Sequence, residues 1–545
     1  MSPAESATSF DVIVVGAAQR LLQAHPETQL AILERDYCVG GVWSKRRNYP
    51  SFWTQWTHGI AEFSDMPMER PPPKDCMNDL FLSKYTTKYL EDYVDNMHHG
   101  HDGKTIQDRI QFHTDVHSIK KMGRYWQLSC IDTNSKCQRL LTTVRLMMAN
   151  GQSSVPNMPN FHGKEQFQGS IVHSIDFGQS SIIQDDTIQE IAVIGAGKSA
   201  ADMVYEAVKA NKTVSWIIRK TGDGLGAAAF APIDLPTPYK NGVEASQARV
   251  MASLQPCYLI SNTWWSWLLH STGFGAKLVS KLFAALDRTV RNYAGYRERK
   301  SDKGFEKLKY DNDIIWQNGT AGGCHFADFW PLVAEKVYVH RANVKSLGKA
   351  ELYLDDGTHF PCDAVLCGTG WQHGFHEKSA KWGKLIREAD ARVLKRFIML
   401  RNPPQHYHKS ESRTPYRLYQ VMAPVHDDSI LFMNHIVAGV KLFVAEAQAI
   451  WAVAYWDKAF QLPSVEKREK DIAHMIAWNK RQYLSNGELG HFAAFDSVPY
   501  VDRLLDEIGL TSYRRKGLLG NMFAPIMPTD LGKVWQEYLA RQTKG

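Results

Sequence analysis

The residues best suited to chemistry are a run of small side chains at positions 195–200, Gly-Ala-Gly-Lys-Ser-Ala. The run follows an apolar stretch, 191–194, and precedes a helical pattern, which is the context in which such a loop binds a dinucleotide pyrophosphate. The first glycine permits a tight turn, the second lets the phosphates approach the backbone, and the final alanine keeps the helix close to the sheet. Free N–H groups at the helix start then face the phosphates. The predicted contacts are Gly195, Gly197, Lys198, Ser199 and Ala200.

A basic pair, Arg219 and Lys220, ends the next apolar run, 24 residues beyond Gly195. A site for NAD would place an acidic residue here to accept hydrogen bonds from the ribose hydroxyls. Two cations suit the ribose 2′-phosphate instead, so this site is predicted to bind NADPH. A solvated basic turn is the alternative.

A damaged copy of the same unit opens the chain, at residues 10–43. Glu34 ends its second apolar run only 18 residues after Gly16, so the unit is about six residues, or nearly two helical turns, shorter than its counterpart. The second and third glycines are absent, and an alanine carries a Cβ where close approach is needed. Gly16, Glu34 and the turn Gly40-Gly41-Val42-Trp43 still indicate a site for an adenine dinucleotide.

These loops need buried parallel strands to hold them. Apolar runs alternate with helical patterns at 10–34 and 188–220, and residues 350–371 read as a hairpin with an Asp-Gly turn, followed by a buried strand. We therefore predict an α/β fold with two Rossmann-like dinucleotide-binding domains, the second inserted into the first. The predicted division is 1–165 and 341–545 for the first domain, with a C-terminal helical region, and 166–340 for the inserted one.

Composition excludes several other classes of protein. The chain has 545 residues and a net charge of +7, which is too mild at this length to indicate nucleic-acid binding. Eight cysteines without a C-x-x-C pair suit a reducing compartment, and no basic-then-apolar leader opens the chain, so a cytoplasmic location is expected. No recurring spacing of metal ligands is present.

Two apolar segments, 257–286 and 435–456, come nearest to membrane helices, but neither gives about 18 uninterrupted apolar residues. We expect both to be buried or amphipathic helices, and no transmembrane segment. The tryptophans of 257–286 leave peripheral membrane contact or an apolar substrate open as alternatives. The oligomeric state is not predicted.

A third pattern ties these features to a known family. Phe167, Gly169, His173 and Phe177 match F-x-G-x-x-x-H-x-x-x-[FY], between the Gly-Gly-x-Trp turn and the intact glycine loop. With the motifs EFSDMPM (62–68) and CGTGW (367–371), this resembles the flavin-containing monooxygenase family, class B, and more narrowly its fungal secondary-metabolite branch. The resemblance spans residues 10 to about 460 and implies FAD and NADPH as cofactors and O2 as co-substrate.

The resemblance also implies roles for residues. In the FAD site it places Gly16, Glu34, Gly41, Trp43, the backbone of Val116, Gly151, Thr369 and Gly370. It places His173 and Phe177 at the crossing between domains, where they would order the approach of the nicotinamide. Three alternatives stay open for the shortened first loop. It still caps the pyrophosphate, with Arg20 adding charge; the FAD site is lost; or the sequence lacks residues that the natural transcript encodes.

By the same resemblance, reduced flavin and O2 would form a flavin hydroperoxide that hydroxylates or epoxidises an apolar small molecule, such as a secondary-metabolite intermediate. Baeyer–Villiger oxygen insertion is an alternative, but those relatives have tryptophan where this chain has Phe177. Gln55 is the candidate for a hydrogen bond to the hydroperoxide. A catalytically impaired NADPH-binding relative with a defective FAD site is the other alternative.

Overall fold

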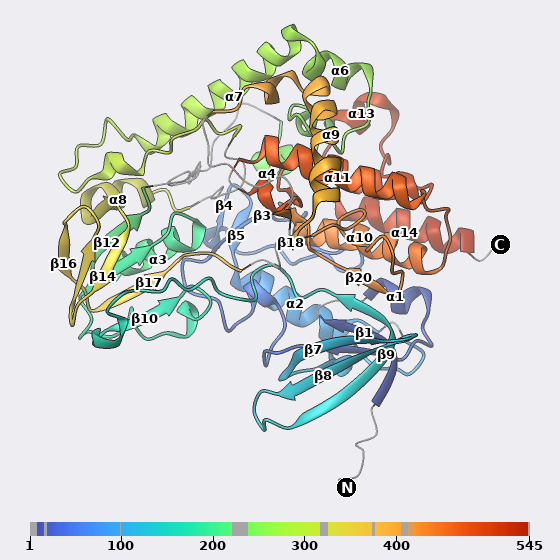
Figure 1. Cartoon of the computed structure of the whole chain (residues 1–545), viewed down its shortest axis with the longest axis horizontal. Helices are drawn as coiled ribbons and strands as arrows, with labels where there is room; N and C mark the ends of the chain where they lie inside the picture. The colour runs from blue at the N-terminus through green and yellow to red at the C-terminus, as the bar shows by residue number, and fades with distance from the viewer. Residues whose placement is uncertain are drawn as a thin grey trace.

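The structure, a computed structural model, describes residues 8–15, 19–98, 100–220, 238–316, 325–372, 377–404, 413–414, 416–484 and 486–542. Figure 1 shows two separate sheets, one at the lower right and one at the left, with a group of helices above and beside them. Apolar parallel strands explain this arrangement, because both faces of such a sheet must be covered by helices. The predicted α/β class is confirmed.

The first sheet has the strand order β6-β2-β1-β9-β8-β7, and β20 joins it at β9. Strands β1, β2, β6, β9 and β20 pair in parallel, whereas β7, β8 and β9 form an antiparallel meander. The bounds are β1 (Thr8–Val15), β2 (Leu30–Leu33), β6 (Ile110–Gln111), β7 (Thr114–Met122), β8 (Tyr125–Asp132), β9 (Gln138–Met148) and β20 (Ile430–Phe432). The short connection α1 (Gln19–Ala24) lies between β1 and β2.

The second sheet is entirely parallel, in the order β10-β17-β11-β12-β13. Its strands are β10 (Ser170–His173), β11 (Glu190–Ile194), β12 (Thr213–Ile218), β13 (Val337–Arg341) and β17 (Ala364–Cys367), and α3 (Lys198–Lys209) and α8 (Phe329–Lys336) pack beside it. Strand β17 pairs with β10 and β11, although the sequence analysis groups residues 341–545 with the first sheet. The division of the chain into domains stays a prediction.

The remaining strands form smaller sheets. The predicted hairpin is present in an antiparallel meander of β14 (Val344–Leu347), β15 (Glu351–Leu354) and β16 (His359–Pro361), where Gly357 has φ +92°. A three-stranded sheet joins β3 (Trp53–Thr57), β4 (Cys76–Met77) and β5 (Leu80–Leu82). Two further pairs are β18 (Glu377–Lys378) with β19 (Arg413–Thr414), and β21 (Val437–Ala438) with β22 (Phe492–Ala493).

Most of the remaining helices form the upper and right-hand part of Figure 1, whereas α2 lies near its centre. They are α2 (Lys84–Asn96), α4 (Gly242–Ser246), α5 (Arg249–Ala252), α6 (Trp264–Ser271), α7 (Gly273–Ala294), α9 (Ala380–Arg396), α10 (Lys441–Trp456), α11 (Val465–Gln482), α12 (Ser497–Glu507), α13 (Gly517–Phe523) and α14 (Pro528–Gln542). Helix α10 is buried along almost its whole length and lies at the centre of the largest hydrophobic core, as expected for segment 435–456. Among the described residues, no helix has the length and apolarity needed to span a bilayer.

Candidate functional site

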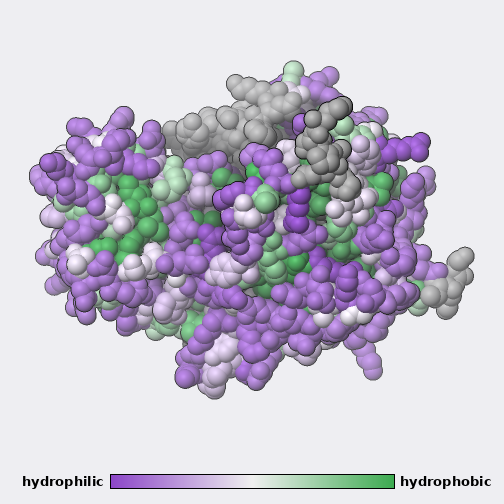
Figure 2. Space-filling model, turned by 90° about the horizontal axis from the view of Figure 1, so that it is seen from below, coloured by the Kyte–Doolittle hydropathy of each residue, from purple (hydrophilic) through white to green (hydrophobic). Residues whose placement is uncertain are grey.

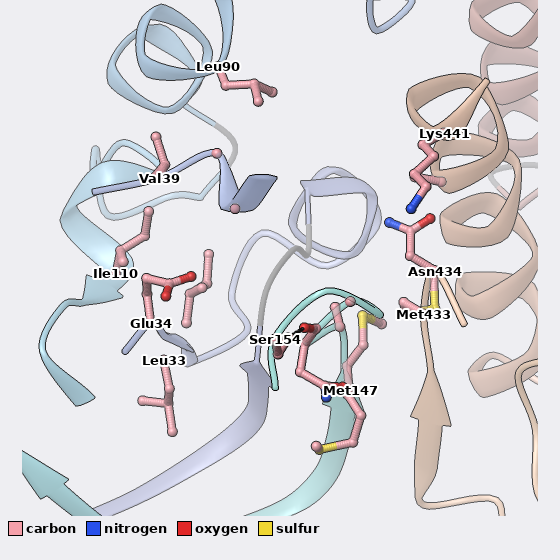
Figure 3. A pocket seen from close by; sticks show the side chains of 18 of the residues that line it. Leu33, Glu34, Val39, Leu90, Ile110, Met147, Ser154, Met433, Asn434 and Lys441 are labelled. Atoms are coloured by element: carbon pink, nitrogen blue, oxygen red, sulfur yellow. Dashed lines mark hydrogen bonds between the residues drawn. The ribbon is translucent and has the colours of Figure 1, made fainter. Parts of the chain in front are cut away.

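A cavity of about 570 Å³ lies between the first sheet, α2 and α10. Its lining brings together residues that are far apart in the sequence, from the end of β2, the turn at 39–43, the loop after β9 and the start of α10 (Figure 3). Of the positions that the family resemblance assigns to FAD, Glu34, Gly41, Trp43, Val116 and Gly151 all line this cavity. Their assignment to FAD remains a prediction, but they share one cavity large enough for a ligand of cofactor size.

One end of the cavity is built around Glu34, at the carboxyl end of β2. The backbone N–H of Asp36 donates to the Glu34 Oε1, at 2.9 Å. Burial raises the pKa of the Glu34 carboxyl, although this hydrogen bond works against the shift. A carboxylate held in this way at the end of the second strand can accept hydrogen bonds from the hydroxyls of a ribose.

Two glycines leave room for a ligand along the cavity wall. Gly41 and Gly151 have φ of +55° and +67°, and a Cβ added at either position would meet no atom within 4 Å. Side chains at positive φ are strained, and here they would also project into open space beside the cavity lining. The cavity wall is therefore bare backbone at these two points, as close approach by a dinucleotide requires.

The other end of the cavity carries two polar groups that the sequence analysis missed, Asn434 and Lys441. Asn434 follows β20 with φ +57°, an uncommon conformation for a residue with a side chain, and its backbone N–H donates to the Gln448 Oε1 at 2.9 Å. Figure 3 shows the Lys441 ammonium, at the first position of α10, pointing toward the Asn434 amide across the cavity from Glu34. Lys441 makes no ion pair or hydrogen bond with any residue that the structure describes, and burial lowers its pKa.

This end of the cavity thus has the donor chemistry that an anionic ligand needs. Lys441 is half-buried, so its ammonium is partly desolvated without a counter-charge among the described residues, and the amino end of a helix adds partial positive charge beside it. In the sequence, the lysine looked only like an interruption of an apolar helix. Its position directly after the loop that follows β20 was the signal that could have revealed it.

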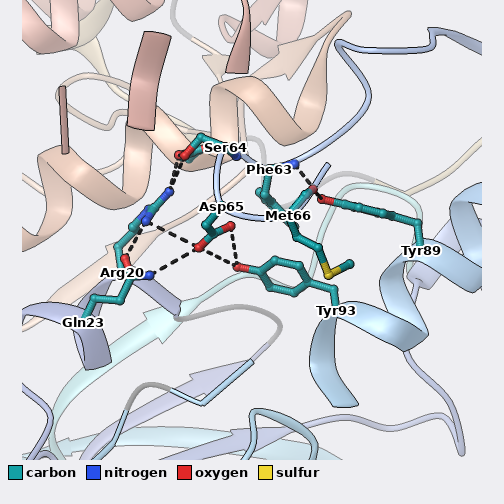
Figure 4. Close-up of polar contacts among 9 residues, drawn as sticks. Arg20, Gln23, Phe63, Ser64, Asp65, Met66, Tyr89 and Tyr93 are labelled. Carbon is teal, nitrogen blue, oxygen red and sulfur yellow. Dashed lines mark hydrogen bonds and ion pairs between the residues drawn. The ribbon is translucent and has the colours of Figure 1, made fainter. Parts of the chain in front are cut away.

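Arg20, the residue expected to add charge near the pyrophosphate, is among the residues that line the cavity, but its guanidinium is already paired with protein groups. Its guanidinium donates to the Glu446 carboxylate in the middle of α10 and, at 2.8 Å, to the Ser64 Oγ (Figure 4). Asp65 lies 3.6 Å from the same guanidinium, and Tyr93 donates to Asp65. Because the buried Glu446 carboxylate already pairs with this guanidinium, a contact between Arg20 and a phosphate stays a prediction.

The second glycine loop has the tight packing that the sequence predicts. Gly195 has φ +124°, and a Cβ there would lie 2.2 Å from the Gly368 carbonyl oxygen. A Cβ on Gly368 would in turn lie 2.7 Å from the Ala200 Cβ. Gly197 is the residue before α3 begins. The helix therefore starts directly against β17, with its amino end at the sheet edge.

The charged residues predicted for NADPH have protein partners. Lys198 donates to the buried carboxylate of Asp202, which also accepts from the Tyr49 hydroxyl at 2.6 Å. Lys220 forms an ion pair with Asp355 at 2.9 Å, while its neighbour Arg219 is exposed. Both predicted 2′-phosphate ligands are exposed, and Lys220 is the one that is paired with a carboxylate. Ser199 begins the same helix.

Two chain crossings join the sheets and lie side by side. The Asn157 N–H donates to the Gly370 carbonyl at 3.0 Å, the Thr369 hydroxyl donates to the Asn157 carbonyl at 2.7 Å, and Pro156 pairs with Trp371 as an isolated bridge. Thr369 and Gly370 therefore lie in this ribbon, outside the lining of the cavity. Their predicted contact with FAD stays a prediction.

His173 fixes the ribbon to β10. Its Nε2 donates to the Gly370 carbonyl at 3.0 Å, and its Nδ1 accepts from the Ile175 N–H at 3.2 Å. Burial lowers the pKa of the imidazole, so the neutral Nε2–H form is favoured. Phe177 packs edge-on against Tyr49, with ring centroids 5.2 Å apart. His173 therefore contacts the crossing, and the roles of His173 and Phe177 toward the nicotinamide stay predictions.

One predicted position, Gln55, is not brought to the cavity. Gln55 lies on β3, where its amide is 3.4 Å from the Trp53 carbonyl, and it is not part of the cavity lining. Gly16 falls outside the described residues, so the shortened loop itself is not described. Within the described part of the chain, no group of three or more His, Cys, Asp or Glu is placed to hold a metal ion.

Comparison with known sequences agrees with this geometry. Residues 15–226 match the model of the pyridine nucleotide-disulphide oxidoreductase family. The chain is 28% identical, over 93% of its length and 99% of the relative's, to an FAD-dependent monooxygenase of the fungus Pyrenophora dematioidea. It is 27% identical, over 98% of each chain, to FAD-dependent monooxygenase resA of Aspergillus sclerotiorum. The resemblance stated from the motifs is confirmed.

Solved structures share the fold. Cyclohexanone monooxygenase from Rhodococcus, solved with NADP+, superposes with a TM-score of 0.60 over 92% of this chain and 98% of that chain, at 13% identity. A steroid monooxygenase bound to NADP superposes with a TM-score of 0.57 over 99% of both chains, at 15% identity. At this identity the likeness concerns the fold alone.

Proposed function

We propose that the chain, a relative of the fungal FAD-dependent monooxygenases, is a flavin monooxygenase that uses FAD, NADPH and O2 to hydroxylate or epoxidise an apolar small molecule. The observation that carries the proposal is the cavity of about 570 Å³, because five family-assigned FAD positions line it from four separate segments. The second loop, with Gly195 closed against Gly368, supports a separate site for NADPH.

The residues present fit both cofactors. Glu34 would hold the ribose of FAD, Gly41 and Gly151 would let its chain pass close to the backbone, and Asn434 with Lys441 would hold the far end. Flavin, when bound, supplies hydride acceptance and O2 activation, which no side chain can provide. The protein supplies position, electrostatics and exclusion of water.

NADPH would sit on the amino end of α3, with Arg219 facing its 2′-phosphate. The ribbon that His173 fixes would set the approach of the nicotinamide to the first site. Because both imidazole nitrogens are used in hydrogen bonds, His173 acts here as a positioning residue that does not exchange protons. The apolar nature of the substrate is inferred from the relatives and from the aromatic surface segments.

The first experiment is to purify the full chain with added FAD, desalt it and record its visible spectrum. Flavin bands in near one-to-one ratio with protein would support the proposal, and NADPH oxidation would follow. A folded but colourless protein would overturn it and favour the impaired relative. Product analysis then separates hydroxylation or epoxidation from Baeyer–Villiger insertion, because only the latter converts a ketone to an ester.

A further inference from the structure

Large apolar side chains are exposed along three neighbouring helices. Trp264 and Trp267 on α6 are 72% and 55% exposed, Phe274 on α7 is 73% exposed, and Leu518 and Leu519 on α13 are 75% and 73% exposed. Leu278, Leu282 and Phe523 belong to the same set. We call these eight side chains the apolar rim. In Figure 1, α7 runs along the outer upper edge of the molecule and α6 and α13 lie at its end.

The three helices are connected through α5. Trp265 of α6 donates from its indole to the Ser253 hydroxyl, at the end of α5, and His270 lies 2.8 Å from the Ser253 carbonyl. Helix α13 packs against α5 from its other side, and α6 packs against α7. The apolar rim is thus spread over one connected group of helices.

Helix α7 has two apolar faces. Ala276, Val279 and Val290 are buried against the protein. Phe274, Leu278 and Leu282 recur at intervals of four residues and form a second stripe, which is exposed. A surface helix of a globular protein normally needs only the first face, so a second stripe marks contact with something outside the chain.

The charge around the rim has one sign. Lys277, Lys281 and Arg288 are exposed on α7, and Lys516 is exposed just before α13. From residue 263 to 294 the only carboxylate is Asp287, which is buried and bonded to Arg291. Residues 513–523 contain no carboxylate. Helices that lie in a membrane interface have the same composition: they are rich in tryptophan, leucine and lysine and poor in acidic residues.

We propose that α6, α7 and α13 form a docking surface for an anionic phospholipid bilayer. The aromatic and leucine side chains would enter the headgroup region, and the lysines would contact lipid phosphates. A second copy of this chain suits the rim less well. A two-fold contact would bring the same cations together, with no exposed carboxylate in residues 263–294 or 513–523 to pair with them. The proposal rests on this surface alone and does not depend on the cofactor sites.

The test is co-sedimentation of the full-length protein with vesicles of phosphatidylcholine alone and with 30% phosphatidylserine, a composition set as about the anionic share of a cytoplasmic leaflet. We expect binding to the anionic vesicles, weakened by salt. The triple variant Trp264→Ser, Phe274→Ser, Leu518→Ser should lose at least tenfold in partitioning. Lys277→Gln with Lys281→Gln should lose about fivefold for each cation. The matched control is Val144→Ser with Tyr125→Ser, which removes exposed apolar groups on β8 and β9.

Equal binding by the triple variant and the control, or no binding by the unmodified protein, would overturn the proposal. Light scattering of the vesicle-free protein gives the other outcome. A dimer that the triple variant dissociates, without vesicle binding, would assign the rim to a second copy. If the triple variant does not fold, hydrogen exchange of the unmodified protein decides, because bound vesicles should protect residues 264–282 and leave β8 unchanged.

Discussion

The Arg20 guanidinium donates to the Glu446 carboxylate and so joins the short helix α1 to the middle of α10. Both side chains are almost completely buried, with 3% and 1% of their surface exposed. Burial raises the pKa of Glu446, and the charge of Arg20 offsets part of that shift. The helix that follows the shortened glycine loop is therefore held to α10 by a buried ion pair.

Arg20→Met should destabilise the fold strongly. It leaves Glu446 buried without a counter-charge, which typically costs about 3 to 5 kcal/mol. Urea unfolding of the apoprotein measures the change. The double variant Arg20→Met, Glu446→Leu should recover much of the loss, because it removes both charges. Lys88→Met, which breaks an exposed pair with Asp92, is the control and should change stability by less than about 0.5 kcal/mol. A small effect of Arg20→Met would show that the pair contributes little.

Gly195→Ala should damage the second loop more than its positive φ alone explains. The new Cβ would lie 2.2 Å from the Gly368 carbonyl oxygen. We expect a loss of roughly 3 kcal/mol from overlap plus strain, together with weaker NADPH binding measured by fluorescence. Gly357→Ala is the matched control, since Gly357 also has positive φ but has no atom within 4 Å of an added Cβ. It should cost only about 1 kcal/mol. Equal losses in the two variants would contradict the argument.

Lys441→Met should change stability and FAD affinity in opposite directions. Removing a half-buried ammonium that has no counter-charge among the described residues should stabilise the apoprotein by up to about 1 kcal/mol. The same change removes positive charge from the cavity and should weaken FAD binding about tenfold, measured by flavin fluorescence on titration. Lys120→Met, on the exposed side of β7, should do neither. If Lys441→Met lowers apoprotein stability, the lysine has a structural partner and the assignment fails.

The buried carboxyl group of Asp496 should make the stability of the protein depend on pH. It is fully buried at the start of α12 and accepts a hydrogen bond from Tyr483, and burial raises its pKa from 3.8 to about 6. Between these values the folded state keeps a proton that the unfolded state has lost. The contribution of Asp496 to the free energy of unfolding is therefore fully present below about pH 4. It decreases by about 3 kcal/mol as the pH rises to about 6.

The check is the difference in unfolding free energy between the unmodified protein and Asp496→Asn, measured in urea from pH 4.5 to 7.5. Taking the difference removes the contributions of the histidines and of the other carboxylates to the pH dependence of stability. The free energy of unfolding of the unmodified protein should fall relative to that of the variant as the pH rises. A flat difference would mean that Asp496 titrates near its ordinary value.

The sequence predicted the elements whose signals are local. The glycines of the second loop, the Asp-Gly turn of the hairpin and the buried helix at 435–456 are each recognisable within a few residues. The family pattern then predicted five of the residues that line the cavity, including Gly151 and Val116, which carry no strong signal of their own.

What could not be predicted depends on contacts between distant segments. Residues 364–367 form an apolar run that would suit either parallel sheet, so the pairing of β17 with β11 was invisible. Arg20 and Glu446 are 426 positions apart, and no periodicity links them. Lys441 was read as an interruption of an apolar helix, because only the fold shows that the first turn of α10 faces a cavity.

The ribbon formed by residues 155–157 and 369–372 has a mechanical consequence. The two crossings are hydrogen-bonded to one another, so they form a single two-stranded hinge. If one sheet rotates against the other, both strands must bend together, and sliding or twisting of one strand alone would break the hydrogen bonds between them. Opening and closing between the two nucleotide-binding units is thereby limited to one axis, and His173, bound to the ribbon at Gly370, lies at the pivot.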